Sequence, residues 1–89
     1  MERINLSDIF RGLARFDYVL IKSPDQIVAY EFGSDLDIFC YDIEGVTAYL
    51  LDDLLRLSPG SKVLVTNFDG HRHVDLLVSG ELNIRFNLS

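Results

Sequence analysis

The chain has 89 residues, of which 48% are hydrophobic and 25% are charged, and its 14 acidic against 8 basic side chains leave a net charge of −6. This length suits one small domain covering residues 1–89, and the composition excludes a disordered or collagen-like chain. The acidic balance argues against binding a nucleic-acid duplex, which needs a basic face, but it leaves open the binding of one nucleotide through a metal ion.

Cysteine content and hydropathy argue against a disulfide-bonded, cysteine-metal or membrane-spanning protein. Cys40 is the single cysteine, which excludes an internal disulfide and a cysteine metal cluster. Its apolar neighbours, Phe39 and Tyr41, predict a small buried side chain. No segment approaches the roughly 20 apolar residues of a membrane span, and no charged start precedes an apolar signal segment. We therefore expect a cytoplasmic protein that does not bind membranes.

The N-terminal residues predict a short amphipathic helix. Asn5 is a favourable N-cap residue, and the apolar side chains that follow it recur at helical spacing. Gly12 lies inside this helix and costs about 1 kcal/mol relative to alanine, so the helix must depend on tertiary packing. The apolar positions are Leu6, Ile9, Phe10, Leu13 and Phe16.

Two strands are predicted before the middle of the chain. Residues 17–22 form a short apolar run that is closed by Ser23 and Pro24, as expected for a buried strand. Residues 25–32 are ambiguous between a short helix and an extended loop. After the Gly33–Ser34 pair, residues 35–41 predict a second strand.

The second half of the chain contains the strongest signals. Residues 43–57 keep apolar side chains in helical register, and their wide apolar face predicts a largely buried helix. Residues 62–68 and 72–78 flank Asp69–Gly70, a strong hairpin signal. Residues 82–88 alternate between apolar and polar, as in a half-solvated strand. This order of elements predicts an α+β domain with a mixed sheet and two main helices packed on one face.

Three aspartates occupy strand positions that are unfavourable for this residue. Asp35 and Asp37 are two residues apart, so their side chains point to the same face about 6.7 Å apart. Asp75 lies between apolar residues in a later strand and shares a face with His73. Carboxylates so placed can share one hard cation or bracket a pair of cations. A solvated strand face is the other interpretation, and the spacing alone leaves both open.

Other polar and aromatic residues have less specific interpretations. His73 can orient a ligand or polarise a substrate beside Asp75, whereas the pair His71 and His73 is also compatible with an ordinary surface. The tyrosines are scattered among apolar residues, which predicts that they lie in the core or at its rim. They are Tyr18, Tyr30, Tyr41 and Tyr49.

The motifs GSDLDIF (residues 33–39) and HVDLLV (residues 73–78) resemble the nucleotidyltransferase fold that is shared with DNA polymerase beta. The similarity covers nearly the whole chain. With DYVLIK (residues 17–22) and GELNIRFNL (residues 80–88), the chain looks closest to bacterial nucleotidyltransferase-like proteins linked to surface-polysaccharide pathways.

This resemblance implies a function and a role for five residues. Asp35 and Asp37 would hold Mg²⁺ or Mn²⁺ bridging a nucleoside triphosphate, and Asp75 would complete a second metal site and help to deprotonate the acceptor. Backbone amides at Gly33 and Ser34 would approach the phosphates. The implied reaction transfers a nucleoside monophosphate from the triphosphate to a hydroxyl or phosphate acceptor.

One departure from the family pattern supports a second hypothesis. Members of the family usually have a Gly-Ser or Gly-Gly pair well before the paired acids, where it cradles the triphosphate, and this chain has no such pair. Lys22 lies at the corresponding place, where it would either meet a phosphate or end a strand. The chain therefore also fits an inactive nucleotidyltransferase-like module that binds a protein partner or a second copy. A plain acidic structural domain would instead place Asp35, Asp37 and Asp75 on separate surfaces.

Overall fold

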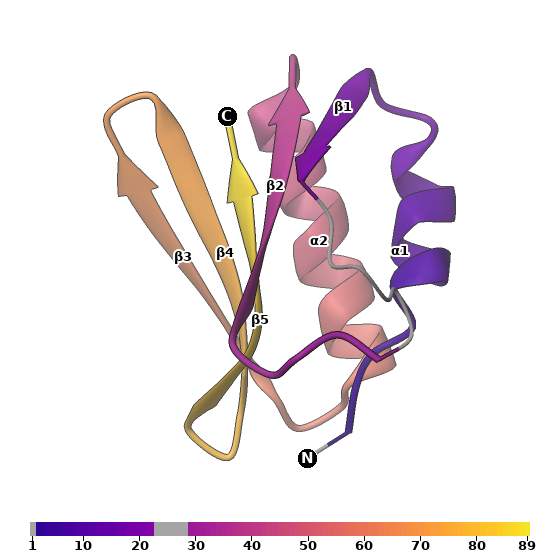
Figure 1. Cartoon of the computed structure of the whole chain (residues 1–89), viewed down its shortest axis with the longest axis vertical. Helices are drawn as coiled ribbons and strands as arrows, with labels where there is room; N and C mark the ends of the chain where they lie inside the picture. The colour runs from indigo at the N-terminus through magenta and orange to yellow at the C-terminus, as the bar shows by residue number, and fades with distance from the viewer. Residues whose placement is uncertain (1, 23–28) are drawn as a thin grey trace.

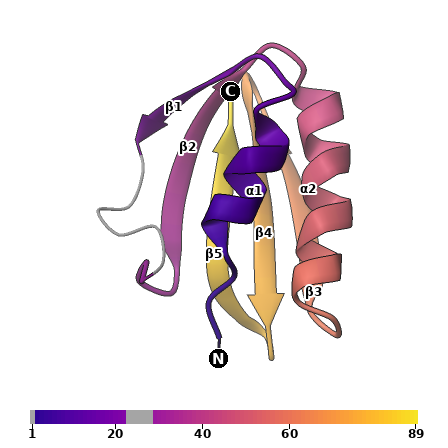
Figure 2. The same cartoon turned by 90° about the vertical axis from the view of Figure 1, so that its right-hand side faces the viewer.

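The computed structural model describes residues 2–22 and 29–89, with the backbone alone for residues 18–22. These described residues form two helices and five strands. The expected α+β class is confirmed, and both helices lie on one face of a mixed sheet (Figures 1 and 2). In order, the elements are α1 (Leu6–Leu13), β1 (Tyr18–Lys22), β2 (Ser34–Cys40), α2 (Ile43–Leu57), β3 (Lys62–Phe68), β4 (His71–Val78) and β5 (Glu81–Leu88).

The second predicted helix, over residues 43–57, and the hairpin agree with these bounds. The first helix begins after Asn5 as predicted but ends at Leu13, so Phe16 lies beyond it instead of on its apolar face. Within the predicted segment 25–32, residues 29–32 form neither helix nor strand, and residues 25–28 lie outside the described residues. Asn5 caps α1 by accepting a hydrogen bond from the Ser7 amide at 3.0 Å. Asp42 caps α2 in the same way, with the Gly45 amide at 2.9 Å. Within the described part of the chain, no helix is both long and apolar enough to cross a membrane.

The last strand in sequence lies at the centre of the sheet. The strand order is β1-β2-β5-β4-β3, in which β2 and β5 are parallel and the other neighbours are antiparallel. β5 can occupy this position because Ile84, Phe86 and Leu88 are fully buried on its helix-facing side. Consequently β2 and β4, which carry the three predicted site aspartates, are separated by a whole strand.

The hydrophobic core fills the space between the helices and the sheet. α1 buries Leu6, Ile9 and Leu13, and a fully buried aliphatic side chain of this size contributes roughly 1.5–3 kcal/mol. Cys40 is buried at the end of β2, as predicted. The remaining core comes mostly from β2, α2 and the two central strands: Leu36, Ile38, Val46, Leu50, Leu54, Val74, Leu76, Ile84, Phe86 and Leu88.

A close contact between the helices explains the glycine inside α1. The Tyr49 hydroxyl of α2 donates a hydrogen bond to the carbonyl oxygen of Ile9 at 3.1 Å. A Cβ atom at Gly12 would overlap this hydroxyl, so glycine permits the close approach.

Tyr30 and Tyr49 are buried as predicted. The prediction is wrong for Tyr41, which is 80% exposed because it follows the end of β2.

A β-bulge in β5 overturns part of the predicted alternation. Leu76 pairs with Ile84 and Leu77 pairs with Leu82, so Asn83 has no partner on β4. The extra residue turns Asn83 into the interior, where it is fully buried instead of solvated. There its Oδ1 accepts from the Tyr30 hydroxyl and its Nδ2 donates to the Glu2 carbonyl oxygen at 2.7 Å.

Candidate functional site

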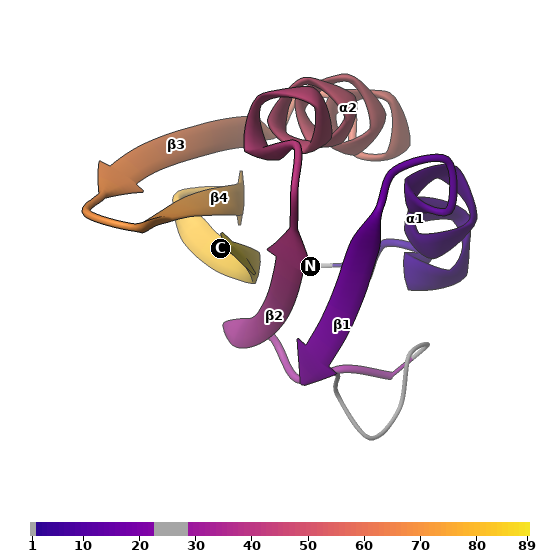
Figure 3. The ribbon, with the colours of Figure 1, turned by 90° about the horizontal axis from the view of Figure 1, so that it is seen from above.

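Asp35 and Asp37 lie on the face of the sheet that the helices leave free. Strand alternation directs the buried Leu36 and Ile38 toward the helices and the two aspartates away from them. Asp35 is exposed and Asp37 is half-buried. Viewed from above, both helices lie on the same side of the curved sheet, and no described element covers the other side (Figure 3). We refer to this side as the uncovered face.

The strand order decides which site residues are neighbours. Asp35 of β2 pairs in register with Arg85 of β5, which in turn pairs with Asp75 of β4. Since neighbouring strands are about 4.8 Å apart, two strand steps place Asp75 roughly 10 Å from Asp35 across the sheet. The uncovered face therefore has a carboxylate on each side of one guanidinium group.

Arg85 binds Asp75 through two of its three guanidinium nitrogens. Its Nε donates to Asp75 Oδ1 at 2.8 Å and its Nη2 donates to Oδ2 at 3.0 Å, a bidentate geometry. The Asp75 side chain is 6% exposed and that of Arg85 is 32% exposed. Hydrogen bonding to Asp75 raises the pKa of Arg85, and the charges of Asp75 and Asp35 act in the same direction. The positive charge of Arg85 offsets the mutual repulsion of the Asp75 and Asp35 carboxylates on either side of it.

The second pair of neighbours connects Asp37 to β5. Asn87 pairs with Asp37 on one side and with His73 on the other. Its Nδ2 donates to Asp37 Oδ1 at 3.1 Å. Its Oδ1, at the opposite end of the same amide, is buried and lacks a hydrogen-bond partner among the described residues. An unsatisfied buried acceptor is unfavourable, so this oxygen has unused capacity for a donor from a ligand.

Gly33 and Ser34 have a structural role at the entrance to β2. The Gly33 amide donates to the Asn83 carbonyl oxygen at 2.9 Å, and the Ser34 amide donates to that of Glu31 at 3.1 Å. Gly33 has φ +86°, a conformation that strongly favours glycine. In this conformation neither amide is free for a phosphate, so phosphate binding by Gly33 and Ser34 stays a prediction. The Lys22 side chain lies outside the described atoms.

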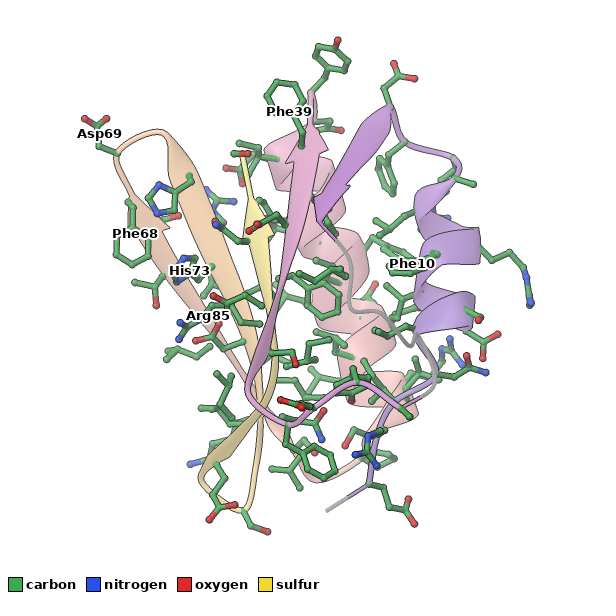
Figure 4. The ribbon with its side chains drawn as sticks, in the orientation of Figure 1. Phe10, Phe39, Phe68, Asp69, His73 and Arg85 are labelled. Carbon is green, nitrogen blue, oxygen red and sulfur yellow. The ribbon has the colours of Figure 1, made fainter. Side chains whose placement is uncertain are left out.

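An aromatic cluster occupies the hairpin end of the uncovered face. Phe68 of β3 stacks on His71 of β4, with ring centroids 4.7 Å apart and planes at 8°. The centroid of His73 is 4.6 Å from that of Phe68 and 5.4 Å from that of His71. Figure 4 shows Phe68, His73 and Arg85 on the side of the sheet away from the helices. The sequence alone singles out the two histidines as candidates, but it contains no signal that points to Phe68 or Arg85.

The described residues provide two free carboxylates for a metal ion rather than three. Among them, no three His, Cys, Asp or Glu side chains are grouped so that they could hold one ion. None of their ion pairs includes Asp35 or Asp37, whereas Asp75 is bound to Arg85. A metal-binding role for Asp75 would require Arg85 to release it, and that role stays a prediction.

Chemically, the pair Asp35 and Asp37 fits Mg²⁺, which proteins commonly bind through one or two carboxylates together with substrate phosphates. No family model, curated protein or solved structure matches the chain. Its function therefore has to be inferred from its own residues and their geometry.

Proposed function

We propose that the protein is a Mg²⁺-dependent nucleotidyltransferase whose nucleotide site is the uncovered face of the sheet. It would transfer a nucleoside monophosphate from a nucleoside triphosphate to a hydroxyl or phosphate acceptor. The observation that supports this best is the position of Asp35 and Asp37, side by side on β2 with no ion-pair partner among the described residues. The resemblance of GSDLDIF and HVDLLV to nucleotidyltransferases adds support, and its narrower form suggests an acceptor in surface-polysaccharide synthesis.

Each polar residue of the uncovered face has a distinct role in this proposal. Asp35 and Asp37 hold Mg²⁺ (or Mn²⁺), and the ion supplies charge stabilisation for the triphosphate during in-line displacement. Arg85 lies between the two acidic strands and offers a fixed positive charge to a phosphate oxygen. Asp75 acts as a positioning residue, because its two oxygens hold the guanidinium in place at 2.8 and 3.0 Å.

Ligand-dependent thermal stability tests the proposed nucleotide site. A ligand that binds only the folded state at 100 times its Kd adds about 2.7 kcal/mol, which in a domain of this size raises Tm by several degrees. We expect this increase with ATP or CTP in the presence of Mg²⁺, and its loss in Asp37→Asn. Asp52→Asn, an exposed aspartate on α2, is the matched control and should keep the increase. A Tm that no nucleotide changes, or an increase that survives Asp37→Asn, would refute the site.

A second candidate function is binding to another copy of the chain. Among the described strands, β3 lies at an edge of the sheet with β4 as its one neighbour, and it exposes about half of Leu64 and of Phe68. Its unpaired backbone groups are a template for strand pairing, so two copies could extend one sheet through β3.

Sedimentation measures this alternative directly. A dimer that dissociates in Leu64→Glu but persists in Leu55→Glu would favour the interaction module. Leu64 and Leu55 are similarly exposed, at 50% and 46%, but Leu55 lies on α2. A monomer at all concentrations would exclude pairing through β3.

A further inference from the structure

The ring cluster at the hairpin is presented to solvent instead of being packed in the core. Phe68 is 47% exposed, and the rings of His71 and His73 are in contact with it at centroid distances of 4.7 and 4.6 Å. Arg72, between the two histidines, points to the opposite face. There it donates to Thr47 Oγ1 at 3.0 Å and to Glu44 Oε1 at 2.7 Å. These bonds attach the hairpin to α2, so the three rings are held on a fixed support.

The cluster lies in line with the carboxylates across the strands. His73 is the register neighbour of Asn87, and Asn87 is that of Asp37. At about 4.8 Å per strand, β4 and β3 are roughly 10 and 14 Å from β2. The uncovered face thus has an acidic end on β2, which could hold a metal-bound phosphate, and an aromatic end on β3 and β4. The distance between these two ends is about the length of an extended nucleotide. Between them lies the buried Asn87 Oδ1, which lacks a donor among the described residues.

From these positions we propose that Phe68, His71 and His73 form a stacking platform for the base of the nucleotide, and that Asn87 Oδ1 accepts a hydrogen bond from a ribose hydroxyl. This proposal rests on the nucleotide site proposed above. Aromatic faces bind any base by stacking, so stacking on the platform does not select one base. The ligand class is thus a ribonucleotide, with weak discrimination among bases.

A nucleoside has a base and a ribose but no phosphate, so its binding tests the platform independently of metal-dependent phosphate binding. Adenosine, added without metal to the full chain, should shift the ring C–H signals of His71 and His73 in a saturable NMR titration. Phe68→Leu should weaken this binding about tenfold, since stacking on one aromatic side chain contributes roughly 1–3 kcal/mol per base. Phe39→Leu is the matched control, because Phe39 is similarly exposed, at 43%, but lies on β2, three strands away from β3. 2′,3′-Dideoxyadenosine, which lacks the 2′ and 3′ hydroxyls of the ribose, should bind more weakly than adenosine.

Unshifted histidine signals, or shifts that survive Phe68→Leu, would overturn the platform. Equal affinities for adenosine and dideoxyadenosine would overturn the role of Asn87. Mg²⁺ with inorganic tripolyphosphate probes the carboxylate end alone. Stabilisation by tripolyphosphate without adenosine binding would refute the platform and keep the proposed function. Adenosine binding without stabilisation by tripolyphosphate would refute the proposed metal site and keep the platform.

Discussion

Asp75 and Arg85 show how one side chain changes the interpretation of an acidic motif. By sequence, Asp75 is the third of three candidate metal ligands, and alternation correctly predicts its face. Its partner could not be predicted, because Arg85 is ten residues away and meets Asp75 only through the pairing of β4 with β5. Asp75 is buried, and both of its oxygens accept hydrogen bonds from the Arg85 guanidinium. The ion pair therefore contributes to the stability of the fold as well as to the candidate site.

Removing Arg85 should therefore destabilise the fold. Arg85→Ala leaves a buried carboxylate unpaired, and we expect a loss of about 2–4 kcal/mol, reduced from the range for fully buried pairs because Arg85 is one-third exposed. Urea unfolding measures the loss, and Asp75→Leu with Arg85→Leu should cost less than the sum of the single substitutions. If Mg²⁺ specifically restores stability to Arg85→Ala, Asp75 can also bind a metal ion. If Arg85→Ala lowers the free energy of unfolding by less than about 0.5 kcal/mol, the ion pair contributes little to stability.

Tyr49 should make the fold sensitive to high pH. Burial, together with the neighbouring carboxylate of Asp53, raises the pKa of Tyr49 to about 12, above its ordinary value near 10. The folded state thus holds this proton more tightly than the unfolded state. The resulting stability is fully present below pH 10 and is lost as the pH rises from 10 to 12.

Denaturant unfolding between pH 9 and pH 11.5 checks this prediction. Tyr49→Phe should be less stable at pH 8, since it loses the hydrogen bond to Ile9, but its stability should fall less steeply above pH 10. Equal slopes for the two proteins would contradict the assignment. Burial also raises the pKa of Tyr30, so a residual slope is expected in the variant.

At the level of elements, the sequence predicts local structure well and long-range pairing poorly. Helix periodicity predicts α2 over residues 43–57 and alternation predicts which side of β2 is buried, because both depend on near neighbours. The bulge at Asn83 depends on a register shift against β4 and on the side chain of Tyr30, 53 residues away. The alternation of residues 82–88 encodes neither the register shift nor the contact with Tyr30, so by itself it predicts that Asn83 faces solvent.

The bulge gives a prediction for β5 as an element. Asn83→Leu removes the acceptor for Tyr30 and the donor to the Glu2 carbonyl oxygen, leaving buried polar groups unsatisfied. We expect a loss of about 2–3 kcal/mol, and faster hydrogen exchange of the Ile4 amide, which donates to the Tyr30 hydroxyl at 2.9 Å. Asn87→Leu is the matched control on the uncovered face and should leave the exchange of Ile4 unchanged. Unchanged stability in Asn83→Leu would show that the network is dispensable.

At the level of the whole molecule, the two faces of the sheet have separate tasks. One face buries the core against α1 and α2, while the uncovered face carries two carboxylates, an arginine, an amide and a cluster of three rings. The net charge of −6 does not describe this face, where acidic and aromatic ends are separated. Strand order produces that separation, and strand order could not be derived from the sequence.

The central place of β5 also determines the order in which the chain can fold. Ser34 pairs with Ile84, so the β1-β2 pair and the β3-β4 hairpin can join only after the chain has been made through residue 88. Until β5 has been synthesised, the edges of β2 and β4 that will later pair with it are unpaired. Unpaired strand edges favour aggregation or chaperone binding. A chain ending at residue 80 should therefore stay unfolded, and addition of a peptide of residues 81–89 should restore a cooperative transition. A stable fold without β5 would disprove this order.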